Sequence, residues 1–346
     1  MIKLPPKIVR RVVVAPAFVA GVTLGLVALP FVVIVAAFLA RYVPGKWRIL
    51  RIVWFLFLYL VVDALAVVVL FVYWVASGFG WKIRTPFWQT AHYSLFGWIL
   101  RRIIRSAKFT FKVALVREGP ARTTDGRRPI LVLSRHAGPG DSLLLMDGLA
   151  NQYRRNPRIV LKEFLQWDPA IDIILNRLPS AFVPAKQKSD DLLQTISEIT
   201  STMLGDDAFV IFPEGGNYTR NRHLRSIEKL REIGRPDLAE RAEALKNTLP
   251  PRSTGVKTAL AAAPANTDVF FIGHAGLETF ESPSEIWRGM PMDTEIAVRI
   301  WHVPAEEIPP ADELETWLFD MWAEIDGWIS ERLASTGEPF DEHDDY

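Results

Sequence analysis

The chain contains no cysteine, which excludes disulfide bonds, thiolate catalysis and cysteine-based metal sites. Negative charge is scarce in its first third. Positions 1–128 hold 19 basic and three acidic residues, whereas the rest of the chain holds 21 basic and 36 acidic residues. The two parts therefore carry net charges of +16 and −15, although the whole chain carries only +1. A basic end followed by an acidic remainder indicates a membrane-facing part and a solvent-facing part.

Charge is absent altogether from residues 12–40, a run longer than the roughly 20 residues that cross a bilayer. A second apolar run, residues 52–76, contains one acid, Asp63. An ionisable group in such a segment is by default functional or paired, and we expect its partner to be a basic interfacial side chain. The first run is too long for the core of a signal peptide. Residues 1–80 are therefore expected to form two membrane helices or a membrane hairpin.

Basic residues flank the first apolar run on both sides, which leaves its orientation open. The two clusters are Lys3, Lys7, Arg10 and Arg11 before the run, and Arg41, Lys46, Arg48 and Arg51 after it. Basic residues that flank membrane segments prefer the cytoplasmic side. Two full spans would put one of the two clusters on the opposite side, whereas a hairpin that returns to the same face keeps both clusters on the cytoplasmic side. Residues 81–108 combine aromatic rings with arginines, which is typical of an interfacial amphipathic helix or of one packed on the domain.

From residue 109 to 334, apolar segments that resemble strands alternate with amphipathic ones, which predicts an α/β sheet with helices on its faces. The expected strands are 109–116, 129–134, 158–161, 208–212, 268–276 and 295–303, and the main helices are 142–155, 191–204, 221–247 and 312–333. The first of these strands rests on the alternation of Phe109, Phe111, Val113 and Leu115. Residues 335–346 are acidic and polar, and we expect a disordered tail there.

Two polar loops each follow a central strand of this expected sheet. The segment SRHAGPGDS (134–142) contains His136 and Asp141, and Glu214 and Gly215 follow the strand at 208–212. In open α/β sheets ligands bind at the carboxyl ends of the strands. A neutral imidazole can take a proton from an attacking hydroxyl, and a carboxylate can hold its other nitrogen. The simpler alternatives are that Asp141 only caps the following helix and that Glu214 is a structural carboxylate.

The order of four motifs resembles the glycerolipid acyltransferase family, which carries His-x4-Asp and Phe-Pro-Glu-Gly motifs. The matching segments are LSRHAGPGDS (133–142), LKEFLQWDPAIDIIL with LPSAFVPAK (161–186), FVIFPEGGNYTR (209–220) and LPPRSTGV (249–256). The resemblance covers roughly residues 105–275 and implies a mixed central sheet flanked by helices, with an N-terminal two-helix membrane element.

The resemblance also implies roles for individual residues. His136 is the expected general base and Asp141 its orienting partner. The expected substrate-binding residues are Lys162, Phe212, Pro213, Glu214, Gly215, Arg220 and Arg252. Gly216 and Asn217 stand where the family has Thr-Arg, so the usual phosphate-binding arginine is missing. Arg220 or Arg222 could replace it from the following helix, unless both belong to a solvated face. In the second motif only Lys186 keeps a charge.

The expected function is a membrane-bound O-acyltransferase that moves a fatty acyl chain to a lysophospholipid, above all lysophosphatidic acid. The co-substrate is acyl-CoA or acyl carrier protein, and neither a cofactor nor a metal is expected. Membrane lipids are expected partners and nucleic acid is not. The expected location is the bacterial inner membrane, with the catalytic domain on its cytoplasmic face. The alternatives are another acceptor, such as lysocardiolipin or a glycolipid, and a non-catalytic membrane scaffold.

Overall fold

A seven-stranded sheet forms the centre of the protein. The structure is a computed structural model and describes residues 4–45, 47–118, 127–138, 140–184, 189–277 and 283–336. Within these residues the strands are β1 (Ala114–Glu118), β2 (Ile130–Ser134), β3 (Asn156–Lys162), β4 (Ala181–Val183), β5 (Asp207–Ile211), β6 (Asp268–Ala275) and β7 (Glu295–Val303). Pro139, Lys186 and most of the expected tail lie outside the described residues.

The sheet is mixed, in the order β1-β7-β6-β2-β5-β3-β4. β6, β2, β5, β3 and β4 run parallel, and β7 pairs with β6 in the antiparallel direction. β1 then pairs parallel with β7, so the last two strands at this edge oppose the other five. The expected α/β fold with a mixed sheet is confirmed. Because β2 and β5 are parallel neighbours, the loops that follow them leave the same edge of the sheet.

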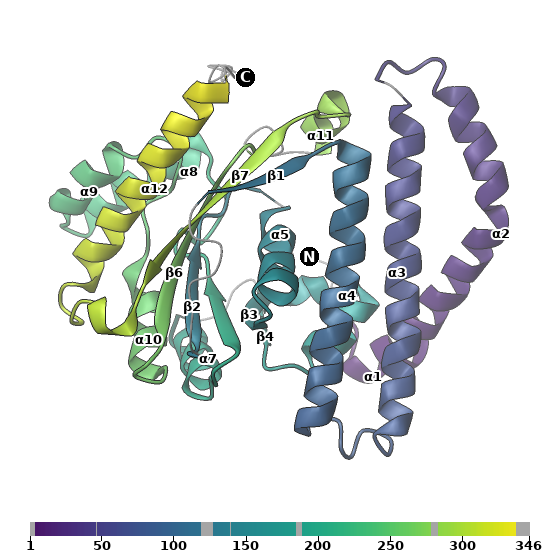
Figure 1. The fold of residues 1–346 in the computed structure, drawn as a ribbon, viewed down its shortest axis with the longest axis horizontal. Helices are drawn as coiled ribbons and strands as arrows, with labels where there is room; N and C mark the ends of the chain where they lie inside the picture. The colour runs from purple at the N-terminus through teal and green to yellow at the C-terminus, as the bar shows by residue number, and fades with distance from the viewer. Residues whose placement is uncertain are drawn as a thin grey trace.

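Side chains alternate between two hydrophobic cores, one on each face of the sheet. Ile130 and Val132 of β2 join the core that three helices cover, α3 (Arg48–Ala76), α4 (Pro86–Phe111) and α6 (Pro169–Leu175). Leu131 and Leu133 join the core beneath α7 (Ser189–Ser201), α10 (Ser253–Ala262) and α12 (Leu314–Thr336). A strand buried on both faces has to be apolar throughout, which explains the continuous run ILVL. Figure 1 shows the N-terminal helices on one side of the sheet and α12 on the other.

Helices cover both faces and connect the strands. They are α1 (Lys7–Val9), the π-helical η1 (Arg10–Val14), α2 (Ala15–Leu39), α3 (Arg48–Ala76), α4 (Pro86–Phe111), α5 (Asp141–Asp147), the π-helical η2 (Gly148–Gln152), η3 (Glu163–Trp167), α6 (Pro169–Leu175), α7 (Ser189–Ser201), α8 (Arg220–Glu232), α9 (Pro236–Glu243), α10 (Ser253–Ala262), α11 (Pro283–Gly289), η5 (Ala305–Glu307) and α12 (Leu314–Thr336). Two stretches, Lys7–Leu39 and Arg48–Ala76, are long and apolar enough to cross a membrane.

Two predicted elements need correction, and several elements were not predicted. The expected strand at 109–116 is wrong in its first half, because Phe109 and Phe111 belong to the last turn of α4 and β1 begins only at Ala114. The helix expected over 221–247 is two helices, α8 and α9, which Gly234, at φ +75°, and Pro236 separate. The short strand β4 and the helices α6 and α10 were not predicted, since their apolar segments are too short to show a period.

The prediction that Asp63 pairs with a basic side chain is also wrong. This buried side chain lies on α3 against the carboxyl group of Asp168, which caps the N-terminus of α6 by accepting from the amide N–H of Ile171. The hydroxyl of Tyr59, also on α3, donates to the same Asp168 carboxylate. The acid in the apolar run therefore belongs to the contact between the N-terminal helices and the rest of the chain.

Candidate active site

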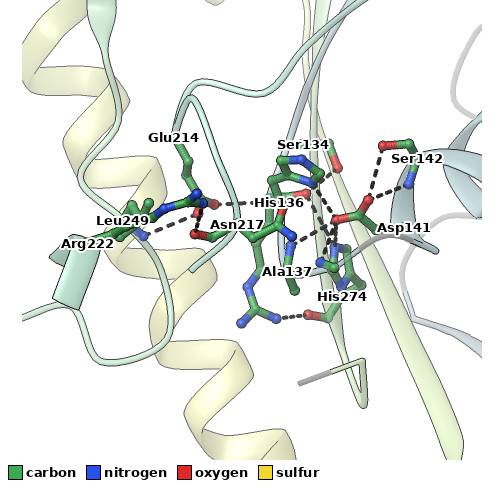
Figure 2. A network of polar contacts seen from close by, with 12 residues as sticks. Ser134, His136, Ala137, Asp141, Ser142, Glu214, Asn217, Arg222, Leu249 and His274 are labelled. Atoms are coloured by element: carbon green, nitrogen blue, oxygen red, sulfur yellow. Dashed lines mark hydrogen bonds and ion pairs between the residues drawn. The ribbon is translucent and has the colours of Figure 1, made fainter. Parts of the chain in front are cut away.

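The two polar loops meet at one edge of the sheet, as their parallel strands require. His136 follows β2 and Glu214 follows β5. The amide N–H of His136 donates to Oε1 of Glu214 at 3.3 Å, and the carbonyl oxygen of His136 accepts from the amide N–H of Tyr218 at 3.2 Å. Both bonds run from the backbone of His136 to the loop after β5. The structure thus brings the two predicted loops together and fixes the position of the imidazole (Figure 2).

The imidazole of His136 points back to Asp141, with 2.8 Å between Nδ1 and Oδ2. A carboxylate can only accept, so Nδ1 carries the hydrogen and Nε2 keeps its lone pair. Oδ2 also accepts from the amide N–H groups of Ala137 and Gly138, at 2.9 and 3.1 Å. The side chain of His136 remains 23% exposed, whereas that of Asp141 is only 2% exposed. Nε2 is therefore the nitrogen that a substrate hydroxyl can reach.

Hydrogen bonds keep Asp141 ionised although it is buried. Burial raises the pKa of this carboxyl, but the hydrogen bond from His136 and the nearby imidazole of His274 outweigh it, so its pKa lies below the ordinary value. Oδ1 accepts from the amide and the hydroxyl of Ser142. Asp141 is the first residue of α5, and Gly140 occupies the capping position that the sequence suggested for Asp141. The carboxylate stabilises the loop and orients His136 at the same time.

The carboxylate of Glu214 is fully buried and holds three segments together. Oε1 accepts from His136, and Oε2 accepts from the amide N–H of Leu249 at 3.3 Å. Burial raises the pKa of Glu214 to about 8, although the charge of Arg135 and the two backbone hydrogen bonds oppose this rise. With both oxygens occupied by backbone groups, Glu214 acts here as a support for the loops. Direct contact with an acceptor stays a prediction.

The residues around Glu214 shape a narrow loop. The ring of Phe212 lies 4.6 Å from the ring of His136, centroid to centroid, and the carbonyl oxygen of Pro213 accepts from the amide N–H of Arg252 at 3.0 Å. Gly215 has φ +70°, and a Cβ there would lie 3.1 Å from the guanidinium carbon of Arg252. Glycine is required at this position by its backbone conformation, and its missing side chain leaves room for the arginine.

Of the two arginines considered as substitutes, both on the first turn of α8, Arg222 contacts the loop with its side chain. Its Nη1 donates to the carbonyl oxygen of Asn217 at 3.1 Å and would lie 3.0 Å from a Cβ at Gly216. Arg220 begins α8 and is exposed, and among the described residues no hydrogen bond or ion pair joins it to the loop. Lys162 is exposed at the end of β3, at the same sheet edge. Figure 2 shows Arg222 beside Asn217 and Glu214.

A cavity of about 310 Å³ lies between α5 and the sheet, directly beside the His136–Asp141 pair. Asp141, Ser134 and His274 line it, and Arg117 and Tyr153 are among its other polar residues. Most of the remaining lining is aliphatic: Leu115, Val116, Leu144, Leu145, Leu149, Ile272, Leu277, Ile296, Val298 and Ile300. The cavity can therefore accept an apolar group beside the carboxylate of Asp141.

Two buried residues of the site were missed by the sequence analysis. Arg135 is 1% exposed and donates from Nη1 to the carbonyl oxygen of His274 at 2.7 Å and from Nη2 to that of Asn247 at 2.8 Å. His274 lies on β6, with Nε2 at 3.8 Å from Oδ2 of Asp141. The sequence feature that could have identified them is a basic or imidazole side chain within an otherwise apolar strand or directly after one. Only the tertiary structure brings β6 next to Asp141.

Comparisons with known proteins bear on the class of the protein. Residues 114–269 match the family model described as Acyltransferase, so this segment belongs to the acyltransferase family and the protein is an acyltransferase. No curated protein matches the sequence. Among solved structures, the 1-acyl-sn-glycerophosphate (LPA) acyltransferase PlsC from Thermotoga maritima is similar, with 12% sequence identity and a TM-score of 0.42. That similarity covers 76% of this chain and 96% of that one.

Proposed function

We propose that the protein transfers a fatty acyl chain from a thioester donor, acyl-CoA or acyl carrier protein, to the free hydroxyl of a lysophospholipid, foremost lysophosphatidic acid. The observation that carries this proposal is the 2.8 Å contact between Nδ1 of His136 and Oδ2 of Asp141, beside an aliphatic cavity. A base held in this way activates a hydroxyl, and the cavity suits the apolar chain of an acyl donor. The acyltransferase family supports the reaction class.

The reaction needs no nucleophile from the protein. Nε2 of His136 takes the proton of the acceptor hydroxyl as its oxygen attacks the thioester carbonyl carbon. The carboxylate of Asp141 stabilises the resulting imidazolium. When the tetrahedral intermediate collapses, the carbon–sulfur bond breaks, and the leaving sulfur takes the proton from His136. One ester and one free thiol are formed, and the imidazole returns to its starting state.

The aliphatic cavity supports a long acyl chain in particular. Each methylene removed from water contributes about 0.8 kcal/mol, so a chain lying among these leucines and isoleucines gains substantial binding free energy. One end of the cavity is lined by Asp141, which orients the base. A chain bound there brings its thioester end close to His136. Binding energy from the chain then contributes to orientation at the reacting carbon.

Two arginines beside the loop after β5 support a phosphate-bearing acceptor. Arg222 and Arg252 lie against Gly216 and Gly215, and among the described residues no carboxylate forms an ion pair with either guanidinium. The domain around them carries a net negative charge, so two uncompensated arginines here favour an anionic ligand. Arg222 thereby supplies the positive charge that the third motif lacks, because Gly216 and Asn217 stand where the family has Thr-Arg.

The N-terminal helices support membrane binding through a hairpin that returns to the same face. Arg48, at one end of α3, donates to the carbonyl oxygens of Arg288 and Met290 at 2.8 and 3.2 Å. At the other end, Arg177 donates to the carbonyl oxygen of Leu70 at 2.8 Å. A helix of this length measures about 43 Å. Since both ends contact the catalytic domain, a bilayer-spanning α3 would draw that domain into the membrane.

The basic cluster at the N-terminus is also engaged by the catalytic domain. Arg10 is 9% exposed and donates to the carboxylate of Asp172 and the side-chain oxygen of Gln166, both at 2.8 Å. α2, by contrast, is largely unburied and presents apolar side chains such as Phe31 and Ile34. We therefore propose that α2 and the outer face of α3 enter the bilayer of the bacterial inner membrane and that the catalytic domain stays on its cytoplasmic face.

The experiment that tests the proposed function measures thiol release and lipid product with a panel of lysophospholipids and glycolipids and a single acyl-CoA. The protein in membranes or detergent should acylate lysophosphatidic acid, and His136→Ala should abolish turnover. Asp141→Asn should lower kcat by about 10²- to 10⁴-fold, because an amide cannot hold the imidazole in the same tautomer. Asp191→Asn, which changes an exposed carboxylate on α7 away from the cavity, is the control.

The outcomes separate the alternatives. Preferential acylation of a lysocardiolipin or a glycolipid would keep the chemistry and change the acceptor. If neither acyl-CoA nor acyl carrier protein yields any thiol with any acceptor, the catalytic proposal is wrong and a scaffold remains. Unchanged turnover by His136→Ala would remove the mechanism.

A further inference from the structure

The strand β6 contains a buried histidine beside the catalytic carboxylate. All eight residues of β6 are buried, and His274 is 5% exposed. It forms a reciprocal contact with the residue that precedes the catalytic base. Nη1 of Arg135 donates to the carbonyl oxygen of His274 at 2.7 Å, and Nε2 of His274 lies 3.3 Å from the carbonyl oxygen of Arg135. A carbonyl can only accept, so Nε2 of His274 carries a hydrogen.

The same nitrogen lies 3.8 Å from Oδ2 of Asp141. This oxygen is the one that accepts from Nδ1 of His136 at 2.8 Å. Asp141 therefore lies between two imidazoles, one on the loop after β2 and the other on β6 (Figure 2). Since the Asp141 side chain is 2% exposed, its charge depends on the dipoles and donors around it.

On the basis of the proposed function, we propose that His274 is a positioning residue. Its ring lies against the Asp141 carboxylate, and the hydrogen bond from its Nε2 to the carbonyl oxygen of Arg135 holds the start of the loop that carries His136, so that His136 and Asp141 keep their alignment. His274 and Asp141 both line the aliphatic cavity, together with Ser134. The ring of His274 thus also limits how far the cavity and any water in it extend toward the carboxylate. Without the ring, Asp141 can turn toward the cavity and lose its alignment with His136.

Other ionisable groups near Asp141 do not duplicate this contact. Lys108 from α4, Arg117 from β1 and Asp147 from α5 line the same cavity, but no hydrogen bond or ion pair is described between them and Asp141. Arg135 directs its guanidinium to the carbonyl oxygens of His274 and Asn247. Among the described side chains, His136 and His274 are thus the imidazoles that face the carboxylate.

The test compares His274→Leu, which keeps bulk but loses the donor, with His274→Gln, whose amide N–H can replace Nε2–H. His274→Leu should lower kcat by about 10- to 100-fold with little change in KM for either substrate. His274→Gln should recover most of that loss. The control is His302→Leu on β7, which removes a histidine bonded to Asp268 at 3.0 Å and stacked on Phe270. It should leave kcat unchanged.

A spectroscopic measurement separates positioning from a general structural role. The nitrogen-15 chemical shifts of the His136 ring, measured without substrate, report which ring nitrogen carries the hydrogen, and a misaligned Asp141 should reduce the share of the Nδ1–H tautomer. His274→Leu should show this change and His302→Leu should not.

The inference is overturned if His274→Leu keeps the wild-type kcat and the wild-type nitrogen-15 shifts of the His136 ring. It is also overturned if His274→Gln and His274→Leu lose activity equally while both unfold at the wild-type temperature. If His274→Leu does not fold, the His136 ring shifts in His274→Gln and His274→Met decide the question: the glutamine variant should match wild type and the methionine variant should differ. This measurement needs no turnover, so it stays informative even if the protein acylates none of the lysolipids.

Discussion

The amide N–H of His136 donates to Oε1 of Glu214 across 3.3 Å, which joins the backbone of the catalytic base to a buried carboxylate on the neighbouring loop. The other oxygen of Glu214 accepts from Leu249. Three segments far apart in sequence therefore depend on one side chain. In this arrangement the Phe-Pro-Glu-Gly motif supports the loop that carries His136, the proposed base.

Glu214 should make stability depend on pH. Burial raises the pKa of Glu214 to about 8, above the value of 4.5 for an ordinary glutamate, so the folded protein holds this proton more tightly than the unfolded chain does. The contribution of protonated Glu214 is fully present below pH 4.5 and is lost as pH rises through about 8. Relative to Glu214→Gln, which cannot ionise, wild type should lose unfolding free energy across this window.

This difference is measured by urea unfolding in detergent at several pH values between 5 and 9. Glu228→Gln, an exposed change on α8, serves as the control and should track wild type. A constant difference between wild type and Glu214→Gln at every pH would contradict the prediction.

Arg222 and Arg252 should determine affinity for the acceptor phosphate. Replacing either by glutamine should raise KM for lysophosphatidic acid by about tenfold with a smaller change in kcat, because one charge-assisted hydrogen bond contributes about 1.5–3 kcal/mol. Arg220→Gln on the first turn of α8 is the matched control, since Arg220 has no described contact with the loop. Steady-state kinetics with lysophosphatidic acid and with the uncharged monoacylglycerol test this, and equal effects on both acceptors would exclude a phosphate contact.

The aliphatic cavity should set the preferred length of the acyl chain. Leu145 lines the cavity, whereas Leu143 on the same helix is 37% exposed and does not line it. Leu145→Trp should fill part of the volume and reduce kcat/KM for long-chain acyl-CoA relative to short-chain acyl-CoA. Leu143→Trp should leave that ratio unchanged. A competition assay with mixed acyl-CoA lengths measures the ratio, and equal loss at all lengths in Leu145→Trp would argue against chain binding there.

The absence of cysteine makes the membrane topology directly testable. In a hairpin that returns to the same face, single cysteines at Lys7 and Tyr42 should both react with an impermeant maleimide added from the cytoplasmic side. In a two-span arrangement the helix Lys7–Leu39 crosses the bilayer, so only one of the two should react from that side. Labelling of inverted and right-side-out vesicles distinguishes the cases, and opposite sidedness would rule out the hairpin.

Much of the fold could be predicted from the sequence, because its signals are local. The buried strand at residues 129–134 and the strand at 295–303 follow from short apolar runs, and the structure has them at Ile130–Ser134 and Glu295–Val303. The segment at 109–116 could not be assigned correctly. Phe109 and Phe111 alternate like a strand but continue α4, because α4 packs against α3 and extends its helix to the sheet.

The residues of the candidate site likewise divide into those that the sequence could identify and those that it could not. His136, Asp141 and Glu214 could be selected from sequence because their loops follow apolar strands at fixed spacing. The sequence could not show that Arg222 rather than Arg220 contacts the loop, because both lie in one exposed helical turn. Only the path of the loop decides which of the two side chains reaches Gly216. The partner of Asp63 was likewise hidden, because Asp168 is more than a hundred residues away.

By itself the sequence determined two properties: an apolar, basic N-terminal part separated from an acidic α/β domain, and an imidazole with a carboxylate five residues later. Both follow from composition and short-range spacing. Tertiary structure alone decided that β6 brings His274 to Asp141, that Glu214 joins three loops, and that arginines at both ends of α3 hold it to the catalytic domain. These contacts join residues distant in sequence, and only the packing of the sheet and its helices brings them close together.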